Sequence, residues 1–159
     1  MNRILINDSL DLCLPDGFHV MDVAERSSLK LLNDGPSEFV TDPDRHITLS
    51  VGWRKAPLIS YLLLNTKDAA KAAERSISGP MGDYGYESLG HTSAVIGGLE
   101  LAGFCFRYTA SGIAMMGEIL VAKHSGHFYY FNYYTREALW EENLSVYRLL
   151  LSESKWTKK

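Results

Sequence analysis

The sequence has little of several features that would mark a known class of protein. It holds only two cysteines, Cys13 and Cys105, and each lies in an apolar pattern, so we expect buried thiols rather than a disulfide. The net charge of −3 gives no support for binding to nucleic acid or to an anionic membrane. The longest candidate span, Leu58 to Leu64, is far shorter than the roughly 20 residues that cross a bilayer. We therefore expect no nucleic-acid and no membrane partner.

The first residues lack the pattern of an export signal. Met1 to Ile6 is followed directly by Asn7 and Asp8, which leaves no apolar core of roughly 7 to 15 residues. We therefore expect a cytoplasmic protein. No internal repeat and no shift in composition divides the chain, so residues 1–159 are expected to form a single domain.

Motifs for catalysis and cofactor binding are lacking as well. No Gly-x-Ser-x-Gly elbow occurs, and the Gly-rich stretch 79–86 lacks the Lys-Ser/Thr that completes a phosphate-binding loop. His124 and His127 flank a predicted turn, but two ligands make a poor zinc site, so we expect exposed turn histidines. The sequence predicts no metal, no cofactor and no enzymatic activity.

Three runs rich in aromatic and β-branched residues dominate the C-terminal half, at 99–110, 113–123 and 128–135. Ser111-Gly112 and Ser125-Gly126 separate them at the spacing of two-residue hairpin turns. The pattern predicts a three-stranded antiparallel meander. With two residues in each turn, the predicted pairs are Cys105 with Glu118, Glu118 with Tyr133, Arg107 with Met116, and Phe104 with Ile119.

Both faces of this meander are mostly apolar, which indicates a sheet that is covered on both sides. One cover is a helix at 136–151, for which Thr135 is the predicted N-cap. The other is the helical segment from Pro57 to Arg75, in which a second helical start is expected with Thr66 as its N-cap. The predicted fold class is α+β, a three-layer α/β/α sandwich with a central, mainly antiparallel sheet.

The rest of the chain contributes shorter elements. A cluster at 7–9 joins two strands into an opening hairpin, and Pro15-Asp16-Gly17 ends its second strand. The remaining predictions are a helix at 22–33, strands at 38–41, 46–54 and 93–96, an irregular loop at 78–90, and a polar tail at 155–159.

Three short motifs stand out, Leu-Cys-Leu-Pro-Asp-Gly-Phe at 12–18, Ile-Gly-Gly at 96–98 and Phe-Tyr-Tyr-Phe at 128–131. With these motifs the chain resembles the PsbP-like family, which includes Ran-binding Mog proteins. The resemblance implies an α/β/α sandwich, in agreement with the two-sided burial. It also implies a protein that binds or assembles with others, because the family shares no catalytic motif.

One polar cluster stands out on the predicted sheet. The register places Arg107, Glu118 and Tyr133 on one face of three adjacent strands, and charged side chains on a covered face need partners. They would either bind a small polar ligand at the end of the sheet or form an Arg107–Glu118 salt bridge that fixes the register.

The loop at 78–90 carries Tyr84 and Tyr86 and is a candidate partner-contact loop. We therefore predict a non-enzymatic cytoplasmic binding or adaptor protein that contacts a protein partner through this loop and an adjacent sheet or helix face. Two alternatives stay open. One is a small-ligand binding protein or enzyme that uses Arg107, Glu118 and Tyr133, and the other is a structural homo-oligomer.

Overall fold

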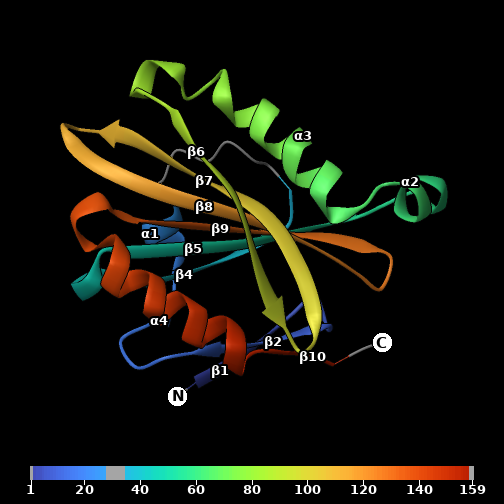
Figure 1. Ribbon diagram of the computed structural model, residues 1–159. Helices are drawn as coiled ribbons and strands as arrows, with labels where there is room; N and C mark the ends of the chain where they lie inside the picture. Colours follow the sequence, from blue (N-terminus) through green and yellow to red (C-terminus); the bar gives the residue numbers. More distant parts are fainter. Residues whose placement is uncertain (1, 28–34, 158–159) are drawn as a thin grey trace.

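The computed structural model describes residues 2–27 and 35–157, which form two antiparallel sheets and four α-helices (Figure 1). The large sheet has the order β3-β4-β5-β9-β8-β7-β6, and the small sheet has the order β1-β2-β10. The strands are β1 (Asn2–Ile6), β2 (Leu10–Leu14), β3 (His19–Val20), β4 (Ser37–Asp42), β5 (Ile47–Lys55), β6 (Glu87–Ile96), β7 (Leu99–Ala110), β8 (Ile113–His124), β9 (His127–Arg136) and β10 (Lys155–Trp156). The helices are α1 (Val23–Ser27), α2 (Leu58–Leu63), α3 (Thr66–Ser78) and α4 (Trp140–Glu153), with 3-10 turns η1 (Pro43–Arg45), η2 (Gly82–Tyr84) and η3 (Glu137–Leu139).

The predicted meander and its register are confirmed. In β7, β8 and β9 all four predicted pairs occur, including Cys105 with Glu118 and Glu118 with Tyr133. The two turns explain this result. Both residues of each turn have positive φ, 51° and 78° at Ser111-Gly112 and 46° and 76° at Ser125-Gly126, which is the geometry that joins antiparallel strands with two residues.

The two faces of the large sheet are covered by different helices, as the predicted α/β/α sandwich requires. On one face, Tyr147 and Leu150 of α4 pack in a buried cluster with Leu120 and Phe131 of the sheet, and the opening hairpin joins the same cluster. On the other face, α3 packs its buried alanines against β7 and β8. Figure 1 shows α3 and α4 on opposite sides of the sheet. The predicted fold class is confirmed.

Both predicted helix caps are wrong by a small distance. The side chain of Asn65, not Thr66, caps α3 by accepting a hydrogen bond from the Asp68 amide at 2.8 Å. Thr135 lies inside β9, where its hydroxyl accepts a hydrogen bond from Asn143 at 2.7 Å, and α4 begins only after η3. Thr135 therefore ties the helix to the sheet instead of starting the helix.

Three predicted segments differ in extent. The irregular loop is shorter than 78–90, because α3 continues to Ser78 and β6 begins at Glu87. The polar tail is wrong for residues 155 and 156, which form β10 and pair with β2, and Trp156 stacks on His124 with ring centroids 4.4 Å apart. Of the helix predicted at 22–33, residues 23–27 are helical and residues 28–33 lie outside the described residues.

Candidate functional site

Glu118 is the centre of a buried polar cluster between β8 and α4. Its carboxylate is fully buried and accepts two hydrogen bonds from the guanidinium of Arg148, each 2.7 Å long. The Cys105 thiol donates to the same carboxylate across 3.7 Å. A buried carboxylate is costly unless it is paired, and this bidentate pairing supplies the partner.

The predicted salt bridge between Arg107 and Glu118 is wrong. Arg107 lies two residues after Cys105, the β7 residue that pairs with Glu118. Its guanidinium is 3.3 Å from Glu137 and 3.8 Å from Glu87, and its side chain stays partly exposed. The reason is that α4, which follows the meander, brings Arg148 directly over Glu118. Both arginines form ion pairs, but the register of the strands alone does not identify their carboxylate partners.

Tyr133 is also held within the protein. Its hydroxyl donates to the carbonyl oxygen of Asn143 at 2.7 Å, and its ring stacks on Tyr147 with centroids 4.0 Å apart and planes within 3°. Burial, reinforced by the charge of Glu118, raises the pKa of Tyr133 above its ordinary value, so the phenol stays protonated. Tyr133 and Glu118 lie under α4, while Arg107 lies further out. A ligand-binding role for these three residues remains a prediction.

The two tyrosines of the Gly-rich loop have different environments. Tyr86 donates its hydroxyl to Glu74 of α3 at 3.0 Å and stacks on Phe106 with centroids 5.4 Å apart. Tyr84 lies in η2 with 47% of its surface exposed. Tyr86 therefore fastens the loop to the body, and Tyr84 is the tyrosine of the pair that is more available to a partner.

The strand after this loop, β6, is the outer edge of the large sheet. Within residues 2–27 and 35–157, β6 pairs with β7 and with no second strand. A register shift between Ser88 and Gly90 bends the start of the strand. Leu89 and Val95 are exposed along it. An uncovered strand edge offers backbone hydrogen-bonding groups to another chain.

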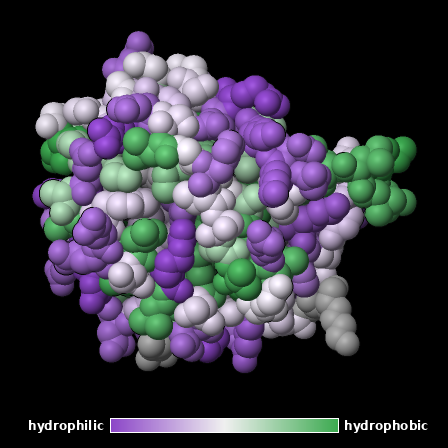
Figure 2. All heavy atoms as spheres, viewed as in Figure 1, coloured by the Kyte–Doolittle hydropathy of each residue, from purple (hydrophilic) through white to green (hydrophobic). Residues whose placement is uncertain are grey.

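Helix α2 presents its aliphatic side chains to solvent. Leu58, Ile59, Leu62 and Leu63 are between 67% and 79% exposed, and Figure 2 shows this hydrophobic group projecting beyond the body. The prediction that the whole segment 57–75 covers the sheet is therefore wrong for these four residues of α2. The cover comes mainly from α3, and α2 adds only Tyr61, which packs on Phe128. An amphipathic pattern identifies an apolar face but not the direction in which that face points.

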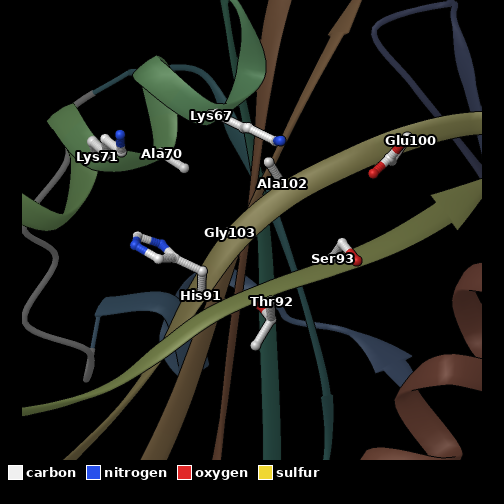
Figure 3. A pocket seen from close by; sticks show the side chains of 9 residues that line it. All are labelled: Lys67, Ala70, Lys71, His91, Thr92, Ser93, Glu100, Ala102 and Gly103. Carbon is white, nitrogen blue, oxygen red and sulfur yellow. The ribbon is translucent and has the colours of Figure 1, made fainter.

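A depression of about 300 Å³ lies between α3 and the strands β6 and β7 (Figure 3). Lys67 and Lys71 reach into it from α3, His91 and Ser93 from β6, and Glu100 from β7. Two lysines beside one carboxylate leave this wall basic. None of the residues predicted to bind a ligand lines it.

Residues 2–27 and 35–157 contain neither a metal centre nor a helix that could span a membrane. Among the described residues, no group of three or more His, Cys, Asp or Glu side chains is arranged to hold a metal ion. Of the predicted turn histidines, His127 donates its Nδ1–H to the Ser125 carbonyl oxygen at 3.0 Å. In the same part of the chain, no helix is long and apolar enough to cross a membrane.

Comparison with known proteins identifies the fold but no close relative. No model of a known protein family matches the sequence, and no curated protein matches it. The chain is similar to cyanobacterial PsbP (CyanoP) from Synechocystis sp. PCC 6803, with a TM-score of 0.72, 17% identity, and coverage of 98% of this chain and 91% of that one.

Two further solved structures share the architecture. LpqN, involved in cell envelope biogenesis of Mycobacterium tuberculosis, has a TM-score of 0.59 at 14% identity, over 93% of this chain and 83% of that one. The Saccharomyces cerevisiae Ran-binding protein Mog1p has a TM-score of 0.55 at 13% identity, over 93% and 84%. The chain therefore has the PsbP/Mog1-like fold, which confirms the resemblance at the level of the fold.

Proposed function

We propose that this protein is a non-enzymatic binding or adaptor protein that holds a partner protein along β6 and the neighbouring Tyr84. The observation that carries this proposal is the uncovered edge of β6, which ends a seven-stranded sheet. Tyr84, Leu89 and Val95 are exposed beside or along that edge. An edge with both backbone groups and apolar side chains offers the two kinds of contact that a bound peptide uses.

The partner segment is an extended strand that adds to the sheet. Residues 90–96 of β6 lie beyond the register shift and form a regular ladder with β7, so the new strand pairs with this part. Backbone hydrogen bonds supply affinity, and the exposed side chains of β6 and Tyr84 supply specificity. Because Tyr86 is bonded to Glu74, the loop that carries Tyr84 is already positioned before binding.

Other observations support this class of function over catalysis. Glu118, the strongest candidate for a catalytic base, is closed off by Arg148 and α4. Mog1p, with the same fold, is a Ran-binding protein. Cys13 and Cys105 form no disulfide, which is consistent with a reducing compartment, and we include the cytoplasm in the proposal.

A site-specific crosslink tests the proposal. A photo-crosslinking amino acid replaces Tyr84 in one variant and Leu149, an exposed residue of α4, in a control variant, and each is irradiated in extract from the source cells. We expect one protein to be captured from position 84 and not from position 149. That protein is then purified and mixed with the wild-type chain, and amide hydrogen exchange is measured.

The exchange data decide whether the edge of β6 is the contact. We expect amides of 90–96 to be protected by the purified partner, while exposed amides elsewhere exchange as before. Equal capture from both positions, or capture without protection of β6, would contradict the proposal. Capture of a second copy of this chain, with light scattering that rises with concentration, would favour the homo-oligomer instead.

A further inference from the structure

Helix α2 packs on the body through one side only and leaves most of its aliphatic side chains exposed. Its inner side is fixed by Tyr61, which contacts Phe128 edge to face with ring centroids 6.1 Å apart. Leu64, directly after the helix, packs in the same cluster. Its outer side carries the four exposed aliphatic residues Leu58, Ile59, Leu62 and Leu63. Exposed apolar groups of this kind mark a surface that meets something other than water.

The shape of this surface restricts what it can meet. The four side chains form a convex projection, visible beyond the body in Figure 2, and not a groove that would receive a helix or peptide. They lie on two adjacent i, i+4 rows of one short helix. A convex apolar surface of this kind inserts into an apolar medium or into a matching cavity of a partner.

The charge around α2 favours an anionic medium. Residues 54–71 contain four basic residues, Arg54, Lys55, Lys67 and Lys71, against the single acidic residue Asp68. This segment therefore carries +3, and because the whole chain carries −3, the remaining residues carry −6. Arg54 and Lys55 line the same hollow as Ser60 of α2 and Leu64, so positive charge lies beside the apolar projection. Additional positive charge comes from Lys123, whose ammonium lies 4.6 Å from the Tyr61 ring centre.

We propose that α2 is a membrane-contact element, with its aliphatic side chains inserted into the interface of an anionic bilayer. The surrounding basic side chains then bind phosphates of the lipid headgroups. An interfacial helix combines apolar insertion with attraction to anionic lipid, and each nearby basic residue strengthens the attachment. Such a contact needs no membrane-spanning helix. The aliphatic residues of α2 are separate from the proposed partner site on β6, whereas Lys67 and Lys71 line the same depression as His91 and Ser93 of that strand.

A second copy of this chain is a less suitable occupant. A stable interface buries about 800 Å² on each partner and involves about 20 to 30 residues a side, which four side chains do not provide. Pairing of two α2 helices would also bring together the basic residues that flank each helix, and like charges at an interface oppose association. A lipid surface requires neither a large interface nor a matching shape.

The proposal departs from the sequence-based expectation of no membrane partner. That expectation used the net charge of the whole chain and the length of its apolar runs. Neither quantity detects basic residues that lie beside one exposed helix. The folded chain places Arg54 and Lys55 next to Ser60 of α2, and Lys67 and Lys71 follow on α3.

Vesicle cosedimentation tests the contact with the full chain. We expect wild-type protein to bind vesicles of equal parts phosphatidylglycerol and phosphatidylcholine at low salt. Binding to pure phosphatidylcholine should be at least about tenfold weaker, and salt of about 0.5 M should weaken binding to the anionic vesicles. The double variant Leu62→Ser, Leu63→Ser should lose at least about tenfold in partitioning, while Leu149→Ser, an exposed apolar control, should bind like wild type.

Charge reversal provides a second, independent readout. Lys67→Glu with Lys71→Glu should reduce binding to anionic vesicles at least about tenfold. Arg136→Glu is the control, because it lies at the far end of β9 from the α2 side, roughly 30 Å from His127. Circular dichroism confirms that each variant is folded. Wild-type protein that binds neither vesicle, or a Leu62/Leu63 variant that binds like wild type, would overturn the proposal.

Discussion

Removing Arg148 should destabilise the protein more than removing the charge of its partner Glu118. The asymmetry comes from burial, since the Glu118 side chain is 1% exposed and that of Arg148 is 34% exposed. In Arg148→Met the carboxylate loses both 2.7 Å hydrogen bonds and stays buried, at a cost of about 3 kcal/mol, the lower end for a broken buried pair. In Glu118→Gln the guanidinium can turn toward water, so about 1 to 2 kcal/mol is expected.

The assay is urea unfolding followed by circular dichroism, with both single variants and the double variant. Because the double variant leaves no buried charge, its loss should be smaller than the sum of the two single losses. Arg107→Met is the matched control, since its ion pairs with Glu87 and Glu137 are longer and exposed, and it should cost less than about 1 kcal/mol. Equal losses for Arg148→Met and Glu118→Gln, or additive losses, would refute the reasoning.

Three further predictions concern stability. Gly103→Ala should cost more than about 3 kcal/mol in urea unfolding, because a Cβ there would overlap a backbone carbonyl of β8, whereas Gly79→Ala meets nothing within 4 Å and should be close to neutral. Burial is the main cause that raises the pKa of Cys105 to about 12, and the negative charge of Glu118 adds to it. The unfolded thiol therefore ionises first, and the free energy of unfolding should fall between pH 9 and 11, which urea titrations at both pH values would measure. Replacing Leu62 and Leu63 by serine should change the free energy of unfolding by less than about 1 kcal/mol, and a larger loss would mean that these two side chains pack on the body.

The part of the fold that could be predicted is the part specified by local rules. The meander depends on two-residue turns, and each turn has a glycine at its second position with φ near 77°. Once the turn length is set, the register follows, and so does the position of Glu118 between Cys105 and Tyr133. Alternation of apolar residues then requires two covering layers. Each of these steps uses residues that are neighbours in sequence or in register.

The rest depended on contacts between distant parts of the chain. Glu118 and Arg148 are 30 residues apart, and their pairing requires the angle at which α4 crosses the sheet. The final strand β10 pairs with β2 near the other end of the chain, and its two residues carry no strand pattern of their own. The exposure of α2 also contradicts the general tendency of leucine to be buried, so no rule based on hydrophobicity could have found it.

The exposed aliphatic residues of α2 and the partner-contact residue Tyr84 lie at opposite ends of helix α3. Figure 1 shows helix α2 just before the first turn of α3, and Tyr84 follows the last turn of α3 in the chain, in η2. Thirteen helical residues separate these ends by roughly 20 Å. One molecule therefore has room to contact a bilayer with α2 and a partner protein with Tyr84 at the same time, which is the geometry of an adaptor. It follows that serine at Leu62 and Leu63 should leave the crosslink from position 84 intact. Loss of both activities in one folded variant would instead indicate a single continuous surface that includes the α3 side.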